Sequence, residues 1–162
     1  MEPRVVTHEA FRVVGLEDWF TPERIREIPG LWARFDPWLE GTLEQHATEF
    51  YGLGQGEVPG PDGTPSLWYM AAVRVPPGAP VPEGLTARTV PAGTYAVFTH
   101  EGHISTIGKT FDAIFQSWLP AAGLRPLPSP GWERYDERWD GRTGTGPVDI
   151  YIPVERSAAR SG

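Results

Sequence analysis

The side chains that could carry out metal, nucleophilic or acid–base chemistry are few, and most of them lie in the second half of the chain. The metal-binding residue types gather as His100, Glu101, His103 and Asp112. Their spacing matches no zinc pattern, and no further ligand can be placed beside them. Ser105 lies close by, but it lacks the Gly-x-Ser-x-Gly elbow of a nucleophilic serine. The absence of cysteine excludes thiol catalysis and disulfides. We therefore expect no metal site and no cofactor.

Aromatic side chains are the more unusual feature of the composition. The 162 residues include seven Trp, five Tyr and seven Phe, which is more than a small core normally uses. Rings that are not needed for packing can stack on a flat ligand or attract a cation. The net charge of −7 attracts cations over long range and repels nucleic-acid phosphates. Many proteins are acidic for solubility alone, so composition by itself is only a weak indication of a cationic ligand.

The elements that must position these rings occur twice, in the order strand, helix, strand, strand. Each predicted helix carries the pattern Phe-x-x-Trp-Leu, at 35–39 and again at 115–119. Pro37 lies inside the first helix, where we expect it to cause a kink or a break. The predicted strands are 5–16, 50–54 and 67–75 in the first half, and 86–90, 93–100, 132–136 and 148–152 in the second.

This repetition predicts an α+β fold of duplicated βαββ units with pseudo-twofold symmetry, covering about 5–76 and 86–154. Residues 1–155 would form a single domain, and 156–162 a disordered tail. The antiparallel sheet would carry its helices on one face and a ligand groove on the other.

Strand alternation then assigns side chains to the two faces of the sheet. In the last strand Ile150 faces the helices, so Asp149 and Tyr151 would face the groove. In the strand 67–75, Trp68 and Met70 would face the groove.

Alternation in 132–136 leaves one question open. It separates Glu133 and Tyr135 from Trp132 and Arg134, but it does not decide which pair faces the groove. On these residues alone, Glu133 would be a surface carboxylate paired with Arg134 or Arg138. Trp32 could belong to the core or to the rim of the groove.

Four segments together resemble the GyrI-like (gyrase-inhibitor-like) effector-binding family, whose members occur alone or as the ligand-sensing ends of AraC-type and MerR-type regulators. They are PAGTYAVFTHEG at 91–102, SWLP at 117–120, WERY at 132–135 and DIYIPV at 149–154. The resemblance extends from Val5 to Val154 and implies two βαββ units around a ring-lined pocket. It also implies a buried glutamate that pairs with a cationic ligand, and by motif position this is Glu133.

The resemblance thus turns Glu133 and Tyr135 toward the groove. The expected ligand-binding residues are Glu133, Tyr135, Trp68, Met70, Tyr151, Asp149 and Trp32. The expected function is binding of aromatic, cationic compounds, for sequestration or sensing. Some stand-alone family members hydrolyse cyclopropane-bearing aromatic compounds, so a hydrolase that uses Glu133 as general base or acid is the alternative.

Partners and location can be predicted only broadly. The chain shows no helix-turn-helix and no basic patch, so we expect no direct DNA binding. It has neither a signal peptide nor a membrane-length apolar run, so we expect a cytoplasmic protein without membrane contact. A protein partner, the oligomeric state and the natural ligand stay open.

Overall fold

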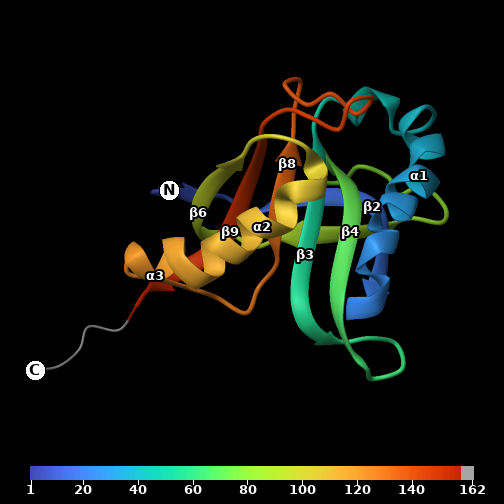
Figure 1. Ribbon diagram of the computed structural model, residues 1–162. Helices are drawn as coiled ribbons and strands as arrows, with labels where there is room; N and C mark the ends of the chain where they lie inside the picture. Colours follow the sequence, from blue (N-terminus) through green and yellow to red (C-terminus); the bar gives the residue numbers. More distant parts are fainter. Residues whose placement is uncertain (158–162) are drawn as a thin grey trace, which may run out of the picture.

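The computed structural model describes residues 1–157, in which nine antiparallel strands form one open sheet with two helices packed on it (Figure 1). The α+β class is therefore confirmed. The strands are β1 Arg4–His8, β2 Phe11–Phe20, β3 Phe50–Pro59, β4 Pro65–Val75, β5 Thr86–Val90, β6 Gly93–His100, β7 Leu124–Pro126, β8 Gly131–Tyr135 and β9 Val148–Arg156. The main helices are α1 Ile28–Leu39, α2 Ile107–Ala113 and its short continuation α3 Leu119–Ala121.

The two halves of the chain meet at the centre of the sheet. The strand order is β1-β6-β9-β8-β3-β4-β2-β5, with β7 pairing the end of β9. The central pair is β3 and β8, in which Gly52 lies opposite Glu133. Moving outward, β4 and β2 follow on one side, and β9 and β6 on the other. Duplication of the two halves stays a prediction.

Both helices cover the same face of the sheet. Leu31 and Phe35 of α1 pack with Tyr69 and Val73 of β4. Ile114 and Leu119, after α2, pack in a second cluster with Ile150 of β9 and other strand residues. Between the two clusters lies the β3–β8 pair, where Glu133 is also opposite Ile150 of β9. The helix face therefore has two apolar parts with Glu133 between them.

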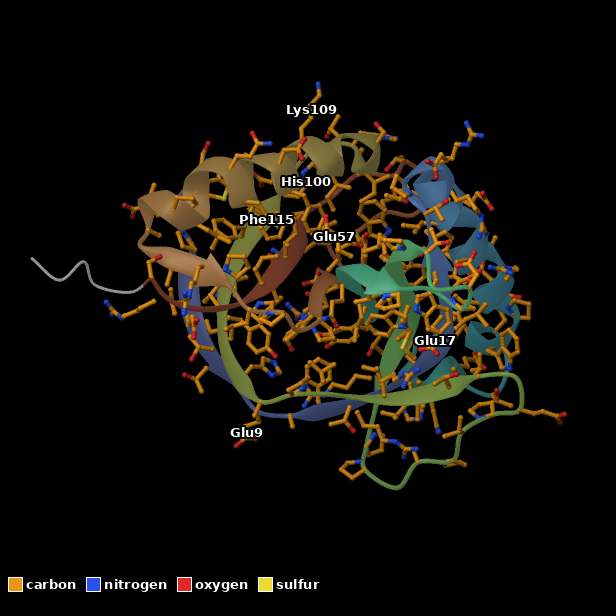
Figure 2. The ribbon with its side chains drawn as sticks, turned by 90° about the horizontal axis from the view of Figure 1, so that it is seen from below. Glu9, Glu17, Glu57, His100, Lys109 and Phe115 are labelled. Carbon is orange, nitrogen blue, oxygen red and sulfur yellow. The ribbon has the colours of Figure 1, made fainter. Side chains whose placement is uncertain are left out.

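The opposite face is also buried. A third cluster, rich in aromatic rings, contains Phe11, Tyr51, Trp68, Met70 and Trp132. Viewed from below, side chains fill the space on both sides of the strands, while Lys109 extends from α2 away from the sheet (Figure 2). Because both faces of the central strands are covered, their side chains alternate between two apolar environments.

Prolines occur in both helices, and the break expected at Pro37 is not found, while a kink there stays a prediction. A 3-10 helix, Pro22–Glu27, begins after Thr21 and leads into α1. The helix α1 then continues past Pro37, which lies in its last turn, to Leu39. The second helix becomes a π-helix at Ile114–Trp118, directly before Leu119 and Pro120.

The first two residues of the predicted tail, Arg156 and Ser157, belong to the described structure. Arg156 is the last residue of β9, and the backbone N–H of Ser157 bonds to the carbonyl of Gly123 at 2.9 Å. The remaining five positions of the predicted tail, 158–162, lie outside the described residues.

Candidate functional site

A hydrogen-bonded cluster surrounds the carboxylate of Glu133 on the helix face. The hydroxyl of Tyr135 donates to Oε1 of Glu133 at 2.7 Å, and the hydroxyl of Tyr69 donates to the same oxygen at 3.0 Å. The indole Nε1–H of Trp32 donates to the Tyr69 hydroxyl at 3.1 Å. The four side chains come from α1, β4 and β8, so the cluster depends on the assembled sheet and on the docking of α1.

A glycine makes room for this cluster. Gly52 of β3 lies between Tyr69 and Glu133, whose strands flank β3 on either side. A Cβ atom at position 52 would lie 2.1 Å from the Tyr69 hydroxyl and 2.8 Å from Oε1 of Glu133. The tyrosine therefore reaches the carboxylate only because β3 presents no side chain there.

Burial governs the titration of these groups. It raises the pKa of the Glu133 carboxyl above its usual value, while the hydrogen bonds from Tyr135 and Tyr69 oppose this rise. Burial also raises the pKa of both tyrosines well above 10, and the nearby negative charge of Glu133 adds to the effect. Both hydroxyls are therefore neutral donors at physiological pH.

The charge of Glu133 has no counter-ion within residues 1–157. The described ion pairs join other carboxylates to arginines, and none includes Glu133. Its Oε2 atom also accepts no hydrogen bond from these residues, although the described part of the chain has no fully buried side-chain oxygen without a partner. Oε2 is therefore not fully buried, in agreement with the partial exposure of Glu133 as a residue.

Aromatic rings stand around the carboxylate. The Trp32 ring lies 5.9 Å from the Tyr135 ring and 6.5 Å from the Phe50 ring, measured between centroids. On its other side, Tyr135 meets the edge of Trp139 at 5.1 Å. A carboxylate with one incompletely buried oxygen among these rings could hold an aromatic cation by charge and by contact with the ring faces.

Comparison with known proteins shows which family the chain belongs to. Residues 1–155 match the family model described as the GyrI-like small molecule binding domain. The chain belongs to the GyrI-like family. The family resemblance inferred from the sequence is confirmed.

Two curated proteins are related to this GyrI-like chain. The transcriptional regulator BrlR of Pseudomonas aeruginosa is 38% identical over 156 residues, which are 95% of this chain and 56% of BrlR. A DNA gyrase inhibitor of Erwinia billingiae is 32% identical over 76 residues, 46% of this chain and 48% of the inhibitor. The chain thus spans about half the length of the curated relatives it matches.

Solved structures share the GyrI-like fold. The structure of SAV2435 bound to tetraphenylphosphonium has a TM-score of 0.74 at 19% identity, covering 96% of this chain and 94% of that one. An integron cassette protein of Vibrio cholerae has a TM-score of 0.68 at 18% identity, covering 96% and 97%. At such identities the likeness concerns the fold alone.

In this GyrI-like chain the Glu133 cluster lies on a different face of the sheet from the one on which the groove was expected. Glu133 and Tyr135 share the helix face with Tyr69, whereas the groove was expected on the face away from the helices. The structure does bring Trp32 to Glu133, through Tyr69. Alternation assigned β4 and β9 correctly, because Tyr69 and Ile150 lie on the helix face and Trp68 lies on the other. The structure instead contradicts the expectation that Glu133 shares the face of Trp68.

Three expected site residues lie on the opposite face of the GyrI-like sheet. Trp68 and Met70 are buried in the aromatic cluster there, and Tyr151 packs against it. The Tyr151 ring stacks on Trp132 at 4.6 Å between centroids, with 12° between the planes. Trp68 donates its indole hydrogen to Glu17, which is labelled in Figure 2. These side chains pack against one another and do not contact Glu133.

Asp149 is the fourth residue placed away from the cluster. It is buried and accepts hydrogen bonds from Thr99 at 2.8 Å and Arg138 at 2.9 Å. Arg134 pairs with Glu49 at 2.8 Å and lies 3.4 Å from Asp149. The two arginines that could have paired with Glu133 are therefore bound to other carboxylates.

Sequence reasoning missed Tyr69, Gly52 and Trp139. Tyr69 lies between Trp68 and Met70 in the sequence, so alternation places it on the helix-packing face, and nothing in the pattern indicates its hydrogen bond to Glu133. Gly52 carried a usable signal, since an isolated glycine inside a strand indicates the close approach of another group. Trp139 lies in a turn region after β8, where no periodic pattern predicts its direction.

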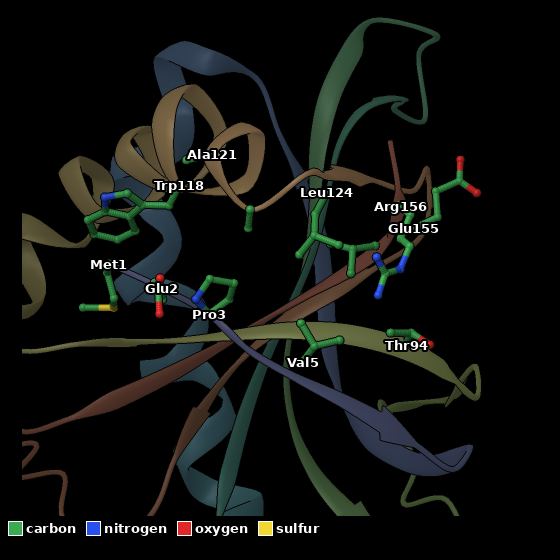
Figure 3. Close-up of a pocket in the computed structure, with 12 residues that line it drawn as sticks. Met1, Glu2, Pro3, Val5, Thr94, Trp118, Ala121, Leu124, Glu155 and Arg156 are labelled. Carbon is green, nitrogen blue, oxygen red and sulfur yellow. The ribbon is translucent and has the colours of Figure 1, made fainter. Parts of the chain in front are cut away.

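Two cavities lie elsewhere on the described surface. One of about 590 Å³ is lined by the N-terminal residues together with Trp118 and Leu124 (Figure 3). Another of about 420 Å³ lies beside Trp38 and Pro82. Glu133 lines neither of them. In residues 1–157 no helix is long and apolar enough to cross a membrane.

Proposed function

We propose that this GyrI-like domain binds aromatic cations at Glu133. The positive charge would lie against Oε2, and the rings of the ligand against Trp32, Tyr135 and Trp139. The observation that carries the proposal is a partly buried carboxylate that has hydrogen-bond donors on one oxygen but no counter-ion in the described chain. In this proposal the protein sequesters or senses such compounds, in the cytoplasm and without contacting DNA itself.

The energetics favour a cationic ligand over a neutral one. Burial disfavours the ionised form of Glu133, and an incoming cation relieves that cost. Each ring face that the cation contacts contributes about 0.5–2 kcal/mol. Flat rings impose no hydrogen-bond geometry, so the site would accept ligands of different shapes.

The comparisons support this ligand class. SAV2435, which shares the fold, was solved bound to tetraphenylphosphonium, an aromatic cation. BrlR is named as a transcriptional regulator, which suits a sensing role for a domain of this family. The net charge of −7 disfavours contact of this chain with nucleic acid.

The decisive experiment compares ligands that differ in charge but share their rings. Methyltriphenylphosphonium and neutral triphenylphosphine oxide would be titrated against the wild type and Glu133→Gln, with tryptophan fluorescence as the readout. We expect the substitution to weaken the phosphonium about tenfold or more and the neutral oxide by less than about threefold. Glu49→Gln is the matched control, because Glu49 pairs with Arg134 away from the cluster. An equal loss for both ligands would reject the charge role.

Hydrolysis of electrophilic, cyclopropane-bearing aromatic compounds is a second candidate function. It is favoured by the raised pKa of Glu133 together with its incompletely buried Oε2, which could accept a proton from an attacking water. A structure described as a hydrolase from Listeria innocua shares the fold, with a TM-score of 0.57 at 11% identity. Incubation with such substrates, followed by mass spectrometry for the water-addition product, tests this function. If the substrate mass does not change, the hydrolase function is rejected and the binding function is retained.

A further inference from the structure

We propose that the Glu133 site selects cations that carry few or no N–H donors, and that Tyr69 and Tyr135 impose this selection. Quaternary ammonium and phosphonium ions would bind well, whereas guanidinium and amidinium ions with the same rings would bind poorly. The inference rests on the proposed function and adds to it the chemistry of the cationic group.

The acceptor sites of the carboxylate limit which cations can pair with it. Each carboxylate oxygen offers about two lone-pair positions. At Oε1 both are taken, one by Tyr135 at 2.7 Å and one by Tyr69 at 3.0 Å. A guanidinium ion pairs best as a fork, with one N–H on each carboxylate oxygen. At Glu133 the fork meets an occupied oxygen, so only a single-oxygen contact at Oε2 is available.

The neighbouring groups offer few acceptors in place of Oε1. The Tyr69 hydroxyl uses its single hydrogen on Glu133 and already accepts from Trp32. The indole of Trp32 is a donor only. Apart from Oε2, the cluster therefore offers only lone pairs on tyrosine oxygens. A guanidinium ion would leave N–H groups without partners, and each such group loses its hydration without compensation.

The tyrosine hydroxyls are also held in place. Tyr69 lies directly over Gly52, between the Trp32 indole and Glu133. The Tyr135 ring is flanked by Trp32 and Trp139, at 5.9 and 5.1 Å. Because both rings are packed, a ligand cannot displace the hydroxyls from Oε1 without moving these neighbours. A cation without N–H donors makes no such demand, since it needs only charge and ring contact.

The test uses two ligands that share a naphthylmethyl group and differ only in the cation, trimethylammonium or guanidinium. Their dissociation constants would be measured by isothermal titration calorimetry on the wild type, Tyr135→Phe, Tyr69→Phe and a control. Tyr51→Phe is the control, because its hydroxyl bonds to Glu49 and its ring packs on the opposite face. We expect the wild type and the control to prefer trimethylammonium about tenfold or more. Either cluster variant should reduce that preference at least threefold by freeing a position on Oε1.

The outcomes separate this inference from the proposed function. If both ligands bind the wild type with equal affinity, or if the guanidinium binds better, the selection is wrong while cation binding stands. If neither ligand binds, the proposed function fails and the selection fails with it. A preference that survives both tyrosine substitutions would also overturn the inference. Thermal melting of each variant identifies any that does not fold, and the other tyrosine then supplies the test.

Discussion

Gly52 and Glu133 face each other across the β3–β8 pair, and a methyl group at position 52 would lie 2.8 Å from the Glu133 carboxylate. Gly52→Ala should therefore displace Tyr69, whose hydroxyl would be only 2.1 Å from the new carbon. We expect at least a tenfold loss of cation affinity and a loss of about 1–3 kcal/mol in the free energy of unfolding. Calorimetry and urea unfolding measure the two effects. Gly56→Ala is the control, since a Cβ there meets nothing within 4 Å.

Glu133→Gln should stabilise the empty protein at neutral pH. Burial raises the pKa of this carboxyl in the folded state, so its contribution to stability is present at low pH and is lost as the pH rises through the folded-state pKa. The glutamine side chain does not ionise, so the variant does not lose this stability as the pH rises. We expect the melting temperature at pH 7 to rise by about 2–4 °C, which corresponds to roughly 1 kcal/mol in a chain of this length. Melting curves from pH 4 to pH 8 should show the gain shrinking toward acid pH. A gain that is independent of pH would contradict this explanation.

Arg138→Met should destabilise the turn that follows β8. Arg138 pairs with Asp136 and Asp149, whose side chains are only 5% and 6% exposed. Its hydrogen bonds lower the pKa of Asp136, so this stabilisation is present above the unfolded-state value near 3.8 and is lost as the pH falls through the folded-state pKa. We expect a loss of about 1–3 kcal/mol in the free energy of unfolding at pH 7, and a smaller loss below pH ~4. Urea unfolding at both pH values measures it. Arg142→Met, at a side chain that is 95% exposed, should change little.

Trp32→Phe should reduce the fluorescence signal that a bound ligand produces, and Trp139 would supply the signal that remains. Trp32 contacts Tyr69 and stands beside Tyr135, so a ligand at Glu133 would quench its emission. The variant also removes the N–H that holds the Tyr69 hydroxyl, and we expect cation affinity to fall about threefold. Trp118→Phe is the comparison, because Trp118 stacks on Phe98 under the other helix. If the quenching survives in Trp32→Phe and disappears in Trp118→Phe, the ligand binds elsewhere.

Much of the architecture could be predicted from residue patterns. The apolar runs at 67–75 and 93–100 are strands in the structure, and the second amphipathic helix begins near the expected residue. Local periodicity is sufficient here because these segments bury strong apolar stripes. It does not reveal β7, which is only three residues long and pairs with the end of β9.

The site could be predicted only in part. Glu133, Tyr135 and Trp32 do come together, but the family motif rather than alternation pointed to Glu133. Alternation did separate the two faces of β4 and β9, but it could not show that both faces are buried, as they are at Trp68 and Tyr69. Asp149 forms an ion pair with Arg138, and Tyr151 stacks on Trp132. Both are long-range contacts, which a one-dimensional pattern does not contain.

The placement of Arg134 prevents this side chain from neutralising Glu133. This guanidinium follows Glu133 directly in the chain, yet the pleat of β8 directs it to the far side, where Glu49 and Asp149 retain it. If the register of β8 were shifted by one residue, Arg134 would lie on the helix face, in the position where the cationic ligand is proposed to bind. Because Arg134 and Arg138 bind other carboxylates, neither neutralises Glu133, and the strand geometry of β8 maintains this separation.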